Sequence, residues 1–430
     1  MSKRVKQAFI FKIKAANLLH LLLSWILLPL TIGALVGSAS ALFLFTLDVA
    51  TAYRENNIWL LALLPLSGLL IGLLYYYYGN SVLKGNNLLL EEFHHPKKII
   101  PFKMAPLVFV GTILTHLFGG SAGREGTALQ MGGAIADQFS AFFKRHPIDR
   151  KILLIIGISG GFASVFGTPL AGALFALEIV VLRKKYYTII VPSFLAAYCA
   201  HFTCLAWNIS HASFKIPVVP PLTLETILWV VCCGIIFGIT ALAYTKSTAF
   251  WTNSFKKTIR FAPFRPMIGG IFIAAAVYFL GTTKYIGLGI PSIESAFTHN
   301  LNGYDFILKL LFTSFTLGAG FKGGEVTPLF FIGATLGNVL VWFVPLPFPL
   351  LAGIGFVAIF SGATNTPIAS TFMGMELFGI ESGFFLAIAC STAYLFSGPK
   401  GIYTAQISAG PKKYIYTKIA EWHRNIRQIE

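Results

Sequence analysis

The chain has 430 residues, of which 56% are hydrophobic and 11% are charged, and its mean hydropathy is +0.73. Since a soluble globular chain is about a quarter charged, this composition excludes an ordinary soluble enzyme and a disordered or collagen-like chain. A net charge of +17 would indicate nucleic-acid binding in a soluble protein. Here the basic residues lie between long uncharged runs, which indicates orientation in a membrane and no nucleic-acid partner.

The chain begins with a basic segment, residues 1–17, that has no acidic residue. Its lysines and arginine alternate with Phe9, Ile10, Phe11 and Ile13. This pattern predicts an amphipathic helix that lies in the membrane interface. A cleaved signal peptide is disfavoured, because no short apolar region with a small-residue cleavage site follows.

Long uncharged runs follow this segment, and most of them are long enough to cross a bilayer, which takes about 20 apolar residues. They are residues 17–47, 56–83, 104–123, 152–177, 186–214, 226–245, 266–283 and 326–375, the last long enough for two crossings. The runs are continuous rather than alternating, which excludes a β-barrel and predicts an all-α polytopic membrane protein. Gly, Pro and polar residues at the centres of several runs predict short, tilted or interrupted helices.

The charges and breaks divide the chain into two membrane repeats, residues 18–215 and 222–398. A basic loop near 246–265, inside the second repeat, has no acid and is predicted to be cytoplasmic. Residues 399–430 are predicted to contain a last short membrane helix and a cytoplasmic tail, too short for a soluble regulatory domain.

Two motifs recur in the same order along the chain. GREGT at 123–127 returns 200 residues later as GGEVT at 323–327. Thr168-Pro169, ten residues before Glu178, returns as Thr366-Pro367, ten residues before Glu376. We interpret this as a duplicated membrane unit, in each half of which a helix is interrupted within the membrane and a new helix starts there. At the Thr-Pro motifs, Thr is predicted to cap the new helix and Pro to lie in its first turn. Such helix starts present free N–H groups and a positive dipole end, which make an anion site. From the residues alone the repeat can be inverted or parallel.

Four glutamates lie inside apolar runs. An ionisable side chain is costly to place there, so each of them is a candidate for a functional or structural role. Glu125 is either a partner of the helix dipole and Arg124, or a gate that fills the anion site when ionised and leaves it when protonated; we favour the gate. Glu325 holds the equivalent place in the second half. For Glu178 and Glu376 we favour a structural role, through hydrogen bonds from loop N–H groups.

Two further breaks contain polar side chains. Asn86 and Asn87 follow Gly85 and form either a turn or a pair of amide donors to an anion. Tyr403 follows a Gly/Pro break, where its phenol could donate to an anion. The cysteines and histidines have no metal-ligand spacing, so we expect no metal and no cofactor. A membrane enzyme would need a His/Asp/Arg cluster at one membrane face, and a scaffold would leave the glutamates unexplained.

Taken together, these motifs resemble the CLC superfamily of anion channels and proton-coupled antiporters. GREGT at 123–127 resembles the family's GREGP, GEVTP at 324–328 falls at its GxFxP, GNNLL at 85–89 falls at the GSGIP of chloride members, and Tyr403 matches its central tyrosine. The resemblance implies the CLC fold, with two inverted halves whose interrupted helices meet at a mid-membrane anion site, and a homodimer with one pathway in each subunit.

The departures from the chloride pattern resemble the fluoride-exporting clade, which has GREGT and GGEVTP. Thr127 replaces a Pro, Asn86 replaces a Ser, and Ile179 stands where proton-coupled chloride members have a second glutamate. The resemblance therefore implies a fluoride/proton antiporter in a bacterial cytoplasmic membrane, with both termini cytoplasmic. The alternative is a chloride/proton antiporter or a chloride channel of the same fold.

The resemblance also implies roles for particular residues, because fluoride is small and strongly hydrated and needs many hydrogen-bond donors. Glu125 is the gating proton carrier, and Glu325 is a second ionisable residue of the pathway. The implied anion-binding residues are Gly85, Asn86, Asn87, Gly123, Arg124, Gly126, Thr127, Val326, Thr327 and Tyr403, with Val326 as an apolar barrier.

Overall fold

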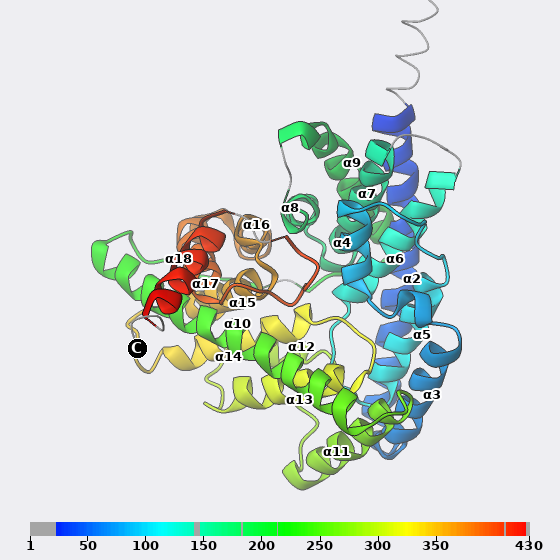
Figure 1. Cartoon of the computed structure of the whole chain (residues 1–430). Helices are drawn as coiled ribbons and strands as arrows, with labels where there is room; N and C mark the ends of the chain where they lie inside the picture. The colour runs from blue at the N-terminus through cyan, green and yellow to red at the C-terminus, as the bar shows by residue number, and fades with distance from the viewer. Residues whose placement is uncertain (1–22, 142–146, 182–183, 213, 408–409, 427–430) are drawn as a thin grey trace, which may run out of the picture.

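The computed structural model describes residues 23–141, 147–181, 184–212, 214–407 and 410–426, which form seventeen α-helices and no β-strand (Figure 1). The helix predicted at 1–17 lies outside these residues. In chain order the helices are α2 (Leu28–Asn56), α3 (Leu64–Tyr77), α4 (Asn86–His94), α5 (Met104–Leu117), α6 (Glu125–Gln138), α7 (Pro147–Phe166), α8 (Pro169–Ile179), α9 (Ile190–Ala206), α10 (Leu224–Thr258), α11 (Phe264–Leu280), α12 (Ile290–Ala296), α13 (Asp305–Ala319), α14 (Val326–Leu340), α15 (Phe348–Thr364), α16 (Pro367–Phe378), α17 (Gly383–Phe396) and α18 (Gly410–Ile426).

Most of the apolar helices are short, as the central Gly and Pro residues predict. Among the residues that the structure describes, four helical segments are long and apolar enough to cross a membrane: Trp25–Asn56, Ile58–Tyr77, Tyr187–Ala206 and Leu224–Thr258. The run at 326–375, long enough for two crossings, instead contains α14, α15 and the greater part of α16. Short helices place their ends inside the protein, and these ends must find partners there.

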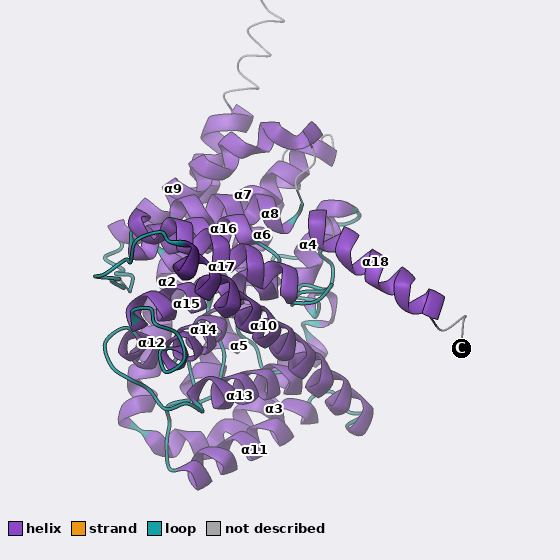
Figure 2. Cartoon of the chain, turned by 90° about the vertical axis from the view of Figure 1, so that its left-hand side faces the viewer, coloured by secondary structure: helices purple, strands orange, loops and turns teal. Residues whose placement is uncertain are grey.

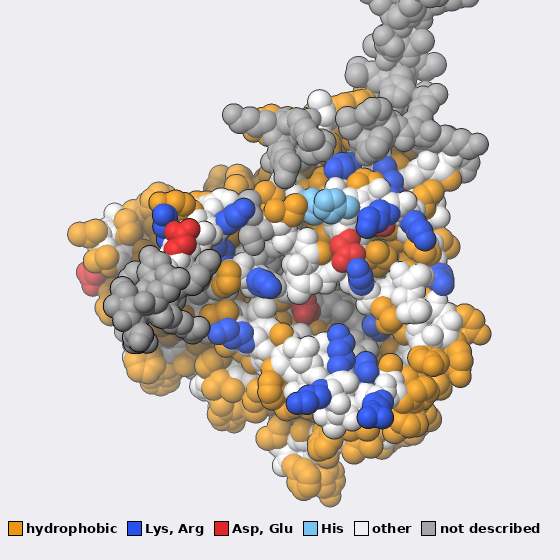
Figure 3. Space-filling model, viewed as in Figure 1, with side chains coloured by type: hydrophobic (Ala, Val, Ile, Leu, Met, Phe, Trp, Pro, Cys, Tyr) orange, Lys and Arg blue, Asp and Glu red, His pale blue; other side chains and the backbone are white. Residues whose placement is uncertain are grey.

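The outer surface is apolar, as a lipid-facing surface must be. Leu35, Leu42, Phe45 and Val49 of α2 are all exposed. Figure 3 shows hydrophobic side chains around the rim of one face, with Lys and Arg over its middle. This distribution fits a multi-pass membrane protein.

The charge pattern predicts a loop at 246–265, and this prediction is wrong over most of the segment. Helix α10 continues to Thr258, so Lys246, Lys256 and Lys257 lie on the helix. The physical reason is that neither Gly nor Pro occurs between Gly238 and Pro263, so nothing stops the helix earlier.

The last helix also differs from its prediction. Residues 399–430 are predicted to hold a short membrane helix, but α18 is not among the apolar helices of the described chain. Its sequence, GPKKYIYTKIAEWHRNI, has polar residues throughout, and the helix projects from the body of the protein (Figure 2). The break before it, at 398–407, is irregular as predicted.

The two halves of the chain contact each other reciprocally through α8 and α16. Glu178, near the end of α8, accepts hydrogen bonds from the N–H groups of Ile368 (3.0 Å) and Ala369 (2.8 Å) at the start of α16. Glu376, near the end of α16, accepts from Leu170 (2.9 Å) and Ala171 (2.8 Å) at the start of α8.

These exchanged contacts mean that α8 and α16 run antiparallel, and reciprocity of this kind is typical of a two-fold relation. The halves are therefore inverted at this contact. Thr168 and Thr366 precede the helices as predicted, with Pro in the first turn, but neither side chain makes a capping hydrogen bond. A carboxylate from the other half takes that role, since it offers two oxygens and a negative charge to the positive helix end.

We expect Glu178→Gln to lower the stability of the folded protein by about 1 kcal/mol, because an amide offers one neutral acceptor to the start of α16. Glu376→Gln should cost less, since the Glu376 side chain is more exposed and screening weakens its charge. Thermal unfolding in detergent measures both changes. The exposed Glu381, just beyond α16, provides the control Glu381→Gln. An equal loss of stability in this variant would contradict the assignment of Glu178 and Glu376 as helix caps.

Candidate functional site

The two repeated glycine motifs meet at the centre of the molecule. The N–H of Gly123 donates to the carbonyl of Gly324, and the N–H of Gly324 donates to the carbonyl of Gly123, both at 2.6 Å. A methyl group added to Gly324 would lie 2.8 Å from the nitrogen of Gly126, so the approach requires glycine. Residues 201 positions apart are thereby joined, and the first turns of α6 and α14 face each other.

The Glu125 side chain, which starts α6, binds to the start of α14. Its carboxylate accepts the N–H of Thr327 at 3.0 Å and the hydroxyl of Thr327 at 2.6 Å. The N–H of Arg124 donates to it at 3.2 Å, and the side chain is 1% exposed. Since Thr327 lies in the first turn of α14, its N–H has no acceptor within the helix. The carboxylate therefore fills an anion-binding position at a helix N-terminus.

The side chain of Arg124 adds positive charge beside this carboxylate without a close hydrogen bond to it. Its Nε lies 3.6 Å from Oε1 of Glu125, and this Nε is buried with no hydrogen-bond partner. The guanidinium thus attracts Glu125 electrostatically while Thr327 determines where the carboxylate sits.

Glu325 occupies the matching place in the second half but is not bound in the same way. It is the N-cap residue of α14 and is only partly buried. No hydrogen bond from a described residue reaches its carboxylate. The sequence repeat is symmetric here, whereas the contacts of the two glutamates are not.

Tyr403 is buried, with 4% of its surface exposed, and the irregular segment 398–407 holds it in place. The N–H of Ile402 donates to the carbonyl of Ala363 at 2.8 Å, at the end of α15. The N–H of Ala405 donates to Oδ1 of Asn87 at 2.9 Å. No acceptor for the Tyr403 hydroxyl lies among the residues that the structure describes, so this donor is available to a bound anion.

A lysine that the sequence analysis does not single out supports the same segment. Lys412, at the start of α18, is 4% exposed. Its Nζ donates to Oδ1 of Asn365 and, at 2.8 Å, to Oγ of Ser397. Asn365 in turn donates to Gln406 at 3.0 Å. The only sequence signal for this role of Lys412 is its position directly after a Gly-Pro helix start.

The two asparagines at the start of α4 have different roles. Gly85 precedes them with φ of +55°, a conformation that favours glycine. Oδ1 of Asn86 is buried with no hydrogen-bond partner, and its Nδ2 would lie 3.1 Å from a methyl group on Gly126. Asn86 therefore faces the first turn of α6. Asn87 accepts the N–H of Ala405 through its carboxamide oxygen, which positions the Tyr403 segment. Its amide nitrogen keeps its donor hydrogens, so the predicted role of Asn87 as a donor to an anion stays a prediction.

Thr127 does not face the Glu125 carboxylate, so its side chain is not placed to bind an anion at that position. Its hydroxyl is hydrogen-bonded to that of Thr112 on α5 at 2.7 Å, and its N–H donates to the carbonyl of Arg124 at 3.2 Å. Successive helix residues turn by about 100°, so a side chain two positions after Glu125 points away from it. Val326 is fully buried and supplies an apolar side chain next to Thr327.

This arrangement can exchange one anion for another. A carboxylate that becomes protonated is neutral and binds a helix N-terminus and an arginine weakly. Its departure would free the N–H and hydroxyl of Thr327 for a small anion. Within the described part of the chain, no three His, Cys, Asp or Glu side chains are placed to hold a metal ion.

A family model and a protein of known sequence match most of this chain. The family model described as voltage gated chloride channel matches residues 67–398. A chloride/fluoride channel protein of Pseudomonas syringae pv. tomato is 50% identical over 396 residues, which cover 91% of this chain and 88% of that protein.

Two solved structures are also similar. The crystal structure of a CLC-type fluoride/proton antiporter superposes with a TM-score of 0.87 at 36% identity, over 90% of this chain and 98% of that one. A slow cyanobacterial Cl⁻/H⁺ antiporter superposes with a TM-score of 0.78 at 18% identity, over 89% and 96%. The second similarity supports the fold alone.

Proposed function

This chain belongs to the voltage gated chloride channel family, and we propose that it is a fluoride/proton antiporter that exports cytoplasmic fluoride. The chain covers most of a relative named for chloride and fluoride, and it is similar over nearly its whole length to a CLC-type fluoride/proton antiporter. The observation that carries the proposal is the Glu125 carboxylate bound by the N–H and hydroxyl of Thr327. A titratable group thus occupies the place that a transported anion would need.

In the proposed cycle, one site alternates between the Glu125 carboxylate and fluoride. A proton from outside neutralises Glu125, which leaves Thr327. Fluoride from the cytoplasm then takes hydrogen bonds from Thr327, with Tyr403 and Asn86 as further donors. Dense donors suit fluoride, because a small ion with a tightly held hydration shell gives up water only for strong hydrogen bonds. Release of the proton inside and of fluoride outside returns Glu125 to its starting position.

Glu325 is proposed as the second ionisable group of the pathway. It lacks the hydrogen bonds that hold Glu125, and it directly precedes α14, whose first turn contains Thr327. Ile179, in α8, is apolar and buried and cannot carry a proton. Glu325 is therefore the group that we assign to proton transfer on the inner side, and Val326 is assigned as an apolar barrier beside the anion.

Several features of the whole protein belong to the same proposal. We place the chain in the bacterial cytoplasmic membrane as a homodimer, with no enzymatic activity, both termini in the cytoplasm, and repeats at 18–215 and 222–398. The Lys and Arg side chains over the face drawn in Figure 3 suit the cytoplasmic side. The physiological reason for export is that hydrofluoric acid enters as a neutral molecule and dissociates inside the cell.

The experiment that tests this function uses purified protein in liposomes loaded with fluoride, with the membrane potential clamped. Fluoride leaving through the protein should drive protons into the liposomes. Leakage of neutral hydrofluoric acid carries protons outward with fluoride, so the direction of proton movement separates antiport from leakage. A chloride gradient that drives protons at the same rate would favour the chloride/proton antiporter, and anion flux without proton movement would favour a channel.

A further inference from the structure

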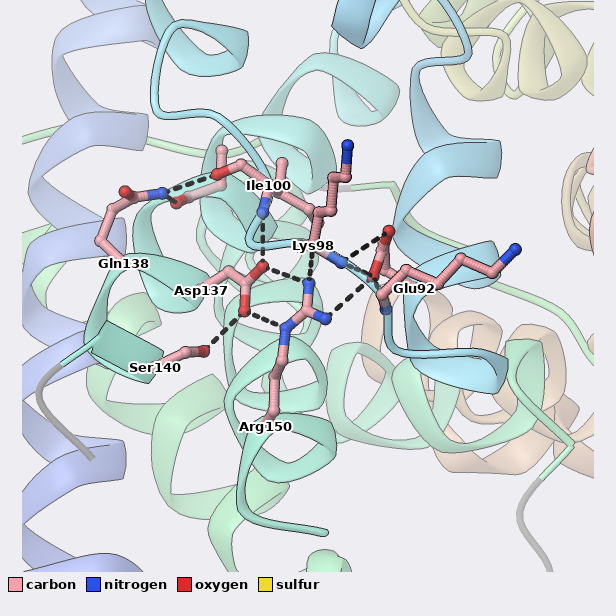
Figure 4. Close-up of polar contacts among 9 residues, drawn as sticks. Glu92, Lys98, Ile100, Asp137, Gln138, Ser140 and Arg150 are labelled. Carbon is pink, nitrogen blue, oxygen red and sulfur yellow. Dashed lines mark hydrogen bonds and ion pairs between the residues drawn. The ribbon is translucent and has the colours of Figure 1, made fainter. Parts of the chain in front are cut away.

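One partly buried arginine joins the far ends of two helices that begin at the anion site (Figure 4). Arg150, near the start of α7, donates from Nη1 to Glu92 at 2.8 Å. It donates from Nε and Nη2 to the two oxygens of Asp137 at 2.8 Å and 2.7 Å, and from Nη2 to the carbonyl of Lys98 at 2.5 Å. Glu92 lies in the last turns of α4, and Asp137 lies in the last turn of α6.

The side chains of this cluster are almost removed from solvent. The exposed fractions of the side chains are 12% for Arg150, 11% for Glu92 and 0% for Asp137. A bidentate contact between an arginine and a carboxylate fixes both the distance and the relative orientation of the two groups, and a lysine cannot reproduce it. With a second carboxylate on its remaining nitrogen, Arg150 holds two helix ends in a defined relation.

The acids of the cluster also organise the connection between α4 and α5. Glu92 accepts the N–H groups of Lys97 at 2.8 Å and Lys98 at 3.2 Å. Asp137 accepts the N–H of Ile100 at 2.7 Å and the hydroxyl of Ser140 at 2.7 Å. The cluster therefore ties α4, the 95–103 connection, α6 and α7 together.

The opposite ends of the same two helices form part of the anion site. Helix α4 has 9 residues and begins with Asn86, and α6 has 14 residues and begins with Glu125. A helix behaves as a stiff rod, so a shift of its last turn moves its first turn. The start of α4 has no side-chain cap, and the ion pair between Lys84 and Glu91 lies on the surface.

We propose that Arg150 is a positioning residue for the anion site, which fixes α4 against α6 and thereby sets the separation between Asn86 and the first turn of α6. This inference rests on the proposed function. Arg150 touches neither the anion nor Glu125, so its loss should weaken anion binding without removing the proton carrier.

The test compares Arg150→Lys and Arg150→Met with the wild-type protein in the fluoride-loaded liposomes. We expect the KM for fluoride to rise about tenfold in Arg150→Lys, as for the loss of a charge-assisted hydrogen bond, and further in Arg150→Met. The number of protons moved per fluoride should stay at the wild-type value. The matched control is Lys84→Met, which removes the exposed ion pair of α4 and should leave the KM unchanged.

Thermal unfolding of the same variants separates positioning from mere stability. If the melting temperature falls while the KM of the folded protein stays at the wild-type value, the proposal is overturned. Should Arg150→Met fail to fold, Arg150→Lys and Glu92→Gln, which keep part of the cluster, are decisive in the same assay. If wild-type protein moves chloride rather than fluoride, the proposed function fails, but the chloride KM of these variants still decides the role of Arg150.

Discussion

Replacement of Glu125 with alanine is expected to abolish proton movement driven by a fluoride gradient, with proton flux falling to that of protein-free liposomes. Glu125 is the ionisable group bound to the first turn of α14, so without it no proton is exchanged for an anion at that place. Glu125→Gln should lose coupling as well, because an amide is neutral and cannot release a proton. Parallel recordings of fluoride and proton flux measure the coupling directly.

The control for this result is Glu178→Gln. Glu178 is also a carboxylate bound to a helix N-terminus, but it lies between α8 and α16 and has no place in the proposed cycle. Its variant should move protons and fluoride in the wild-type ratio once corrected for the amount of folded protein. Stoichiometric proton flux in Glu125→Ala would rule out Glu125 as the proton carrier.

Thr327→Val is expected to raise the KM for fluoride by roughly ten- to a hundredfold. The substitution keeps the shape of the side chain and the backbone N–H but removes the hydroxyl that donates to Oε1 of Glu125 at 2.6 Å. A hydrogen bond to a charged group contributes about 1.5–3 kcal/mol, and 1.4 kcal/mol is a factor of ten in affinity. Initial rates of fluoride flux at several fluoride concentrations measure the change.

Two companion variants make this prediction specific. Thr327→Ser restores the hydroxyl and should return the KM close to that of the wild-type protein. Thr127→Val makes the same chemical change at the residue whose hydroxyl is bound to Thr112, so it should leave the KM unchanged in folded protein. The expectation fails if Thr327→Val binds fluoride as well as wild type, or if Thr127→Val weakens binding equally.

The internal repeat was enough to locate the centre of the molecule from the sequence. The glycines before Glu125 and Glu325 predict breaks, and both glutamates stand at helix starts as expected. Local rules suffice for this, because a glycine-rich break followed by a helix-forming stretch is decided by residues close together in the chain. The inverted CLC fold is what the family resemblance of these motifs implies, and it is confirmed by the structural similarity.

Contacts between residues that are distant in the sequence could not be predicted from these local rules. Nothing near Thr127 or Thr327 in the sequence says that the first turns away and the second binds Glu125, since their motifs are alike. The caps of α8 and α16 come from Glu376 and Glu178 in the opposite half, whereas sequence reasoning assigns them to the adjacent threonines. The asymmetry of Glu125 and Glu325 also depends on which groups the fold brings to each carboxylate.

By itself, the sequence determined the membrane class, the helix breaks and the identity of the central glutamates. Burial of acids in an apolar chain is costly, so their positions are visible without coordinates. Only the tertiary structure decided which partner each of these carboxylates has: Thr327 for Glu125, the opposite helix start for Glu178 and Glu376, and Arg150 for Glu92 and Asp137. Hydrogen bonds depend on distance and angle between atoms, and the fold sets both for residues that are up to 318 positions apart.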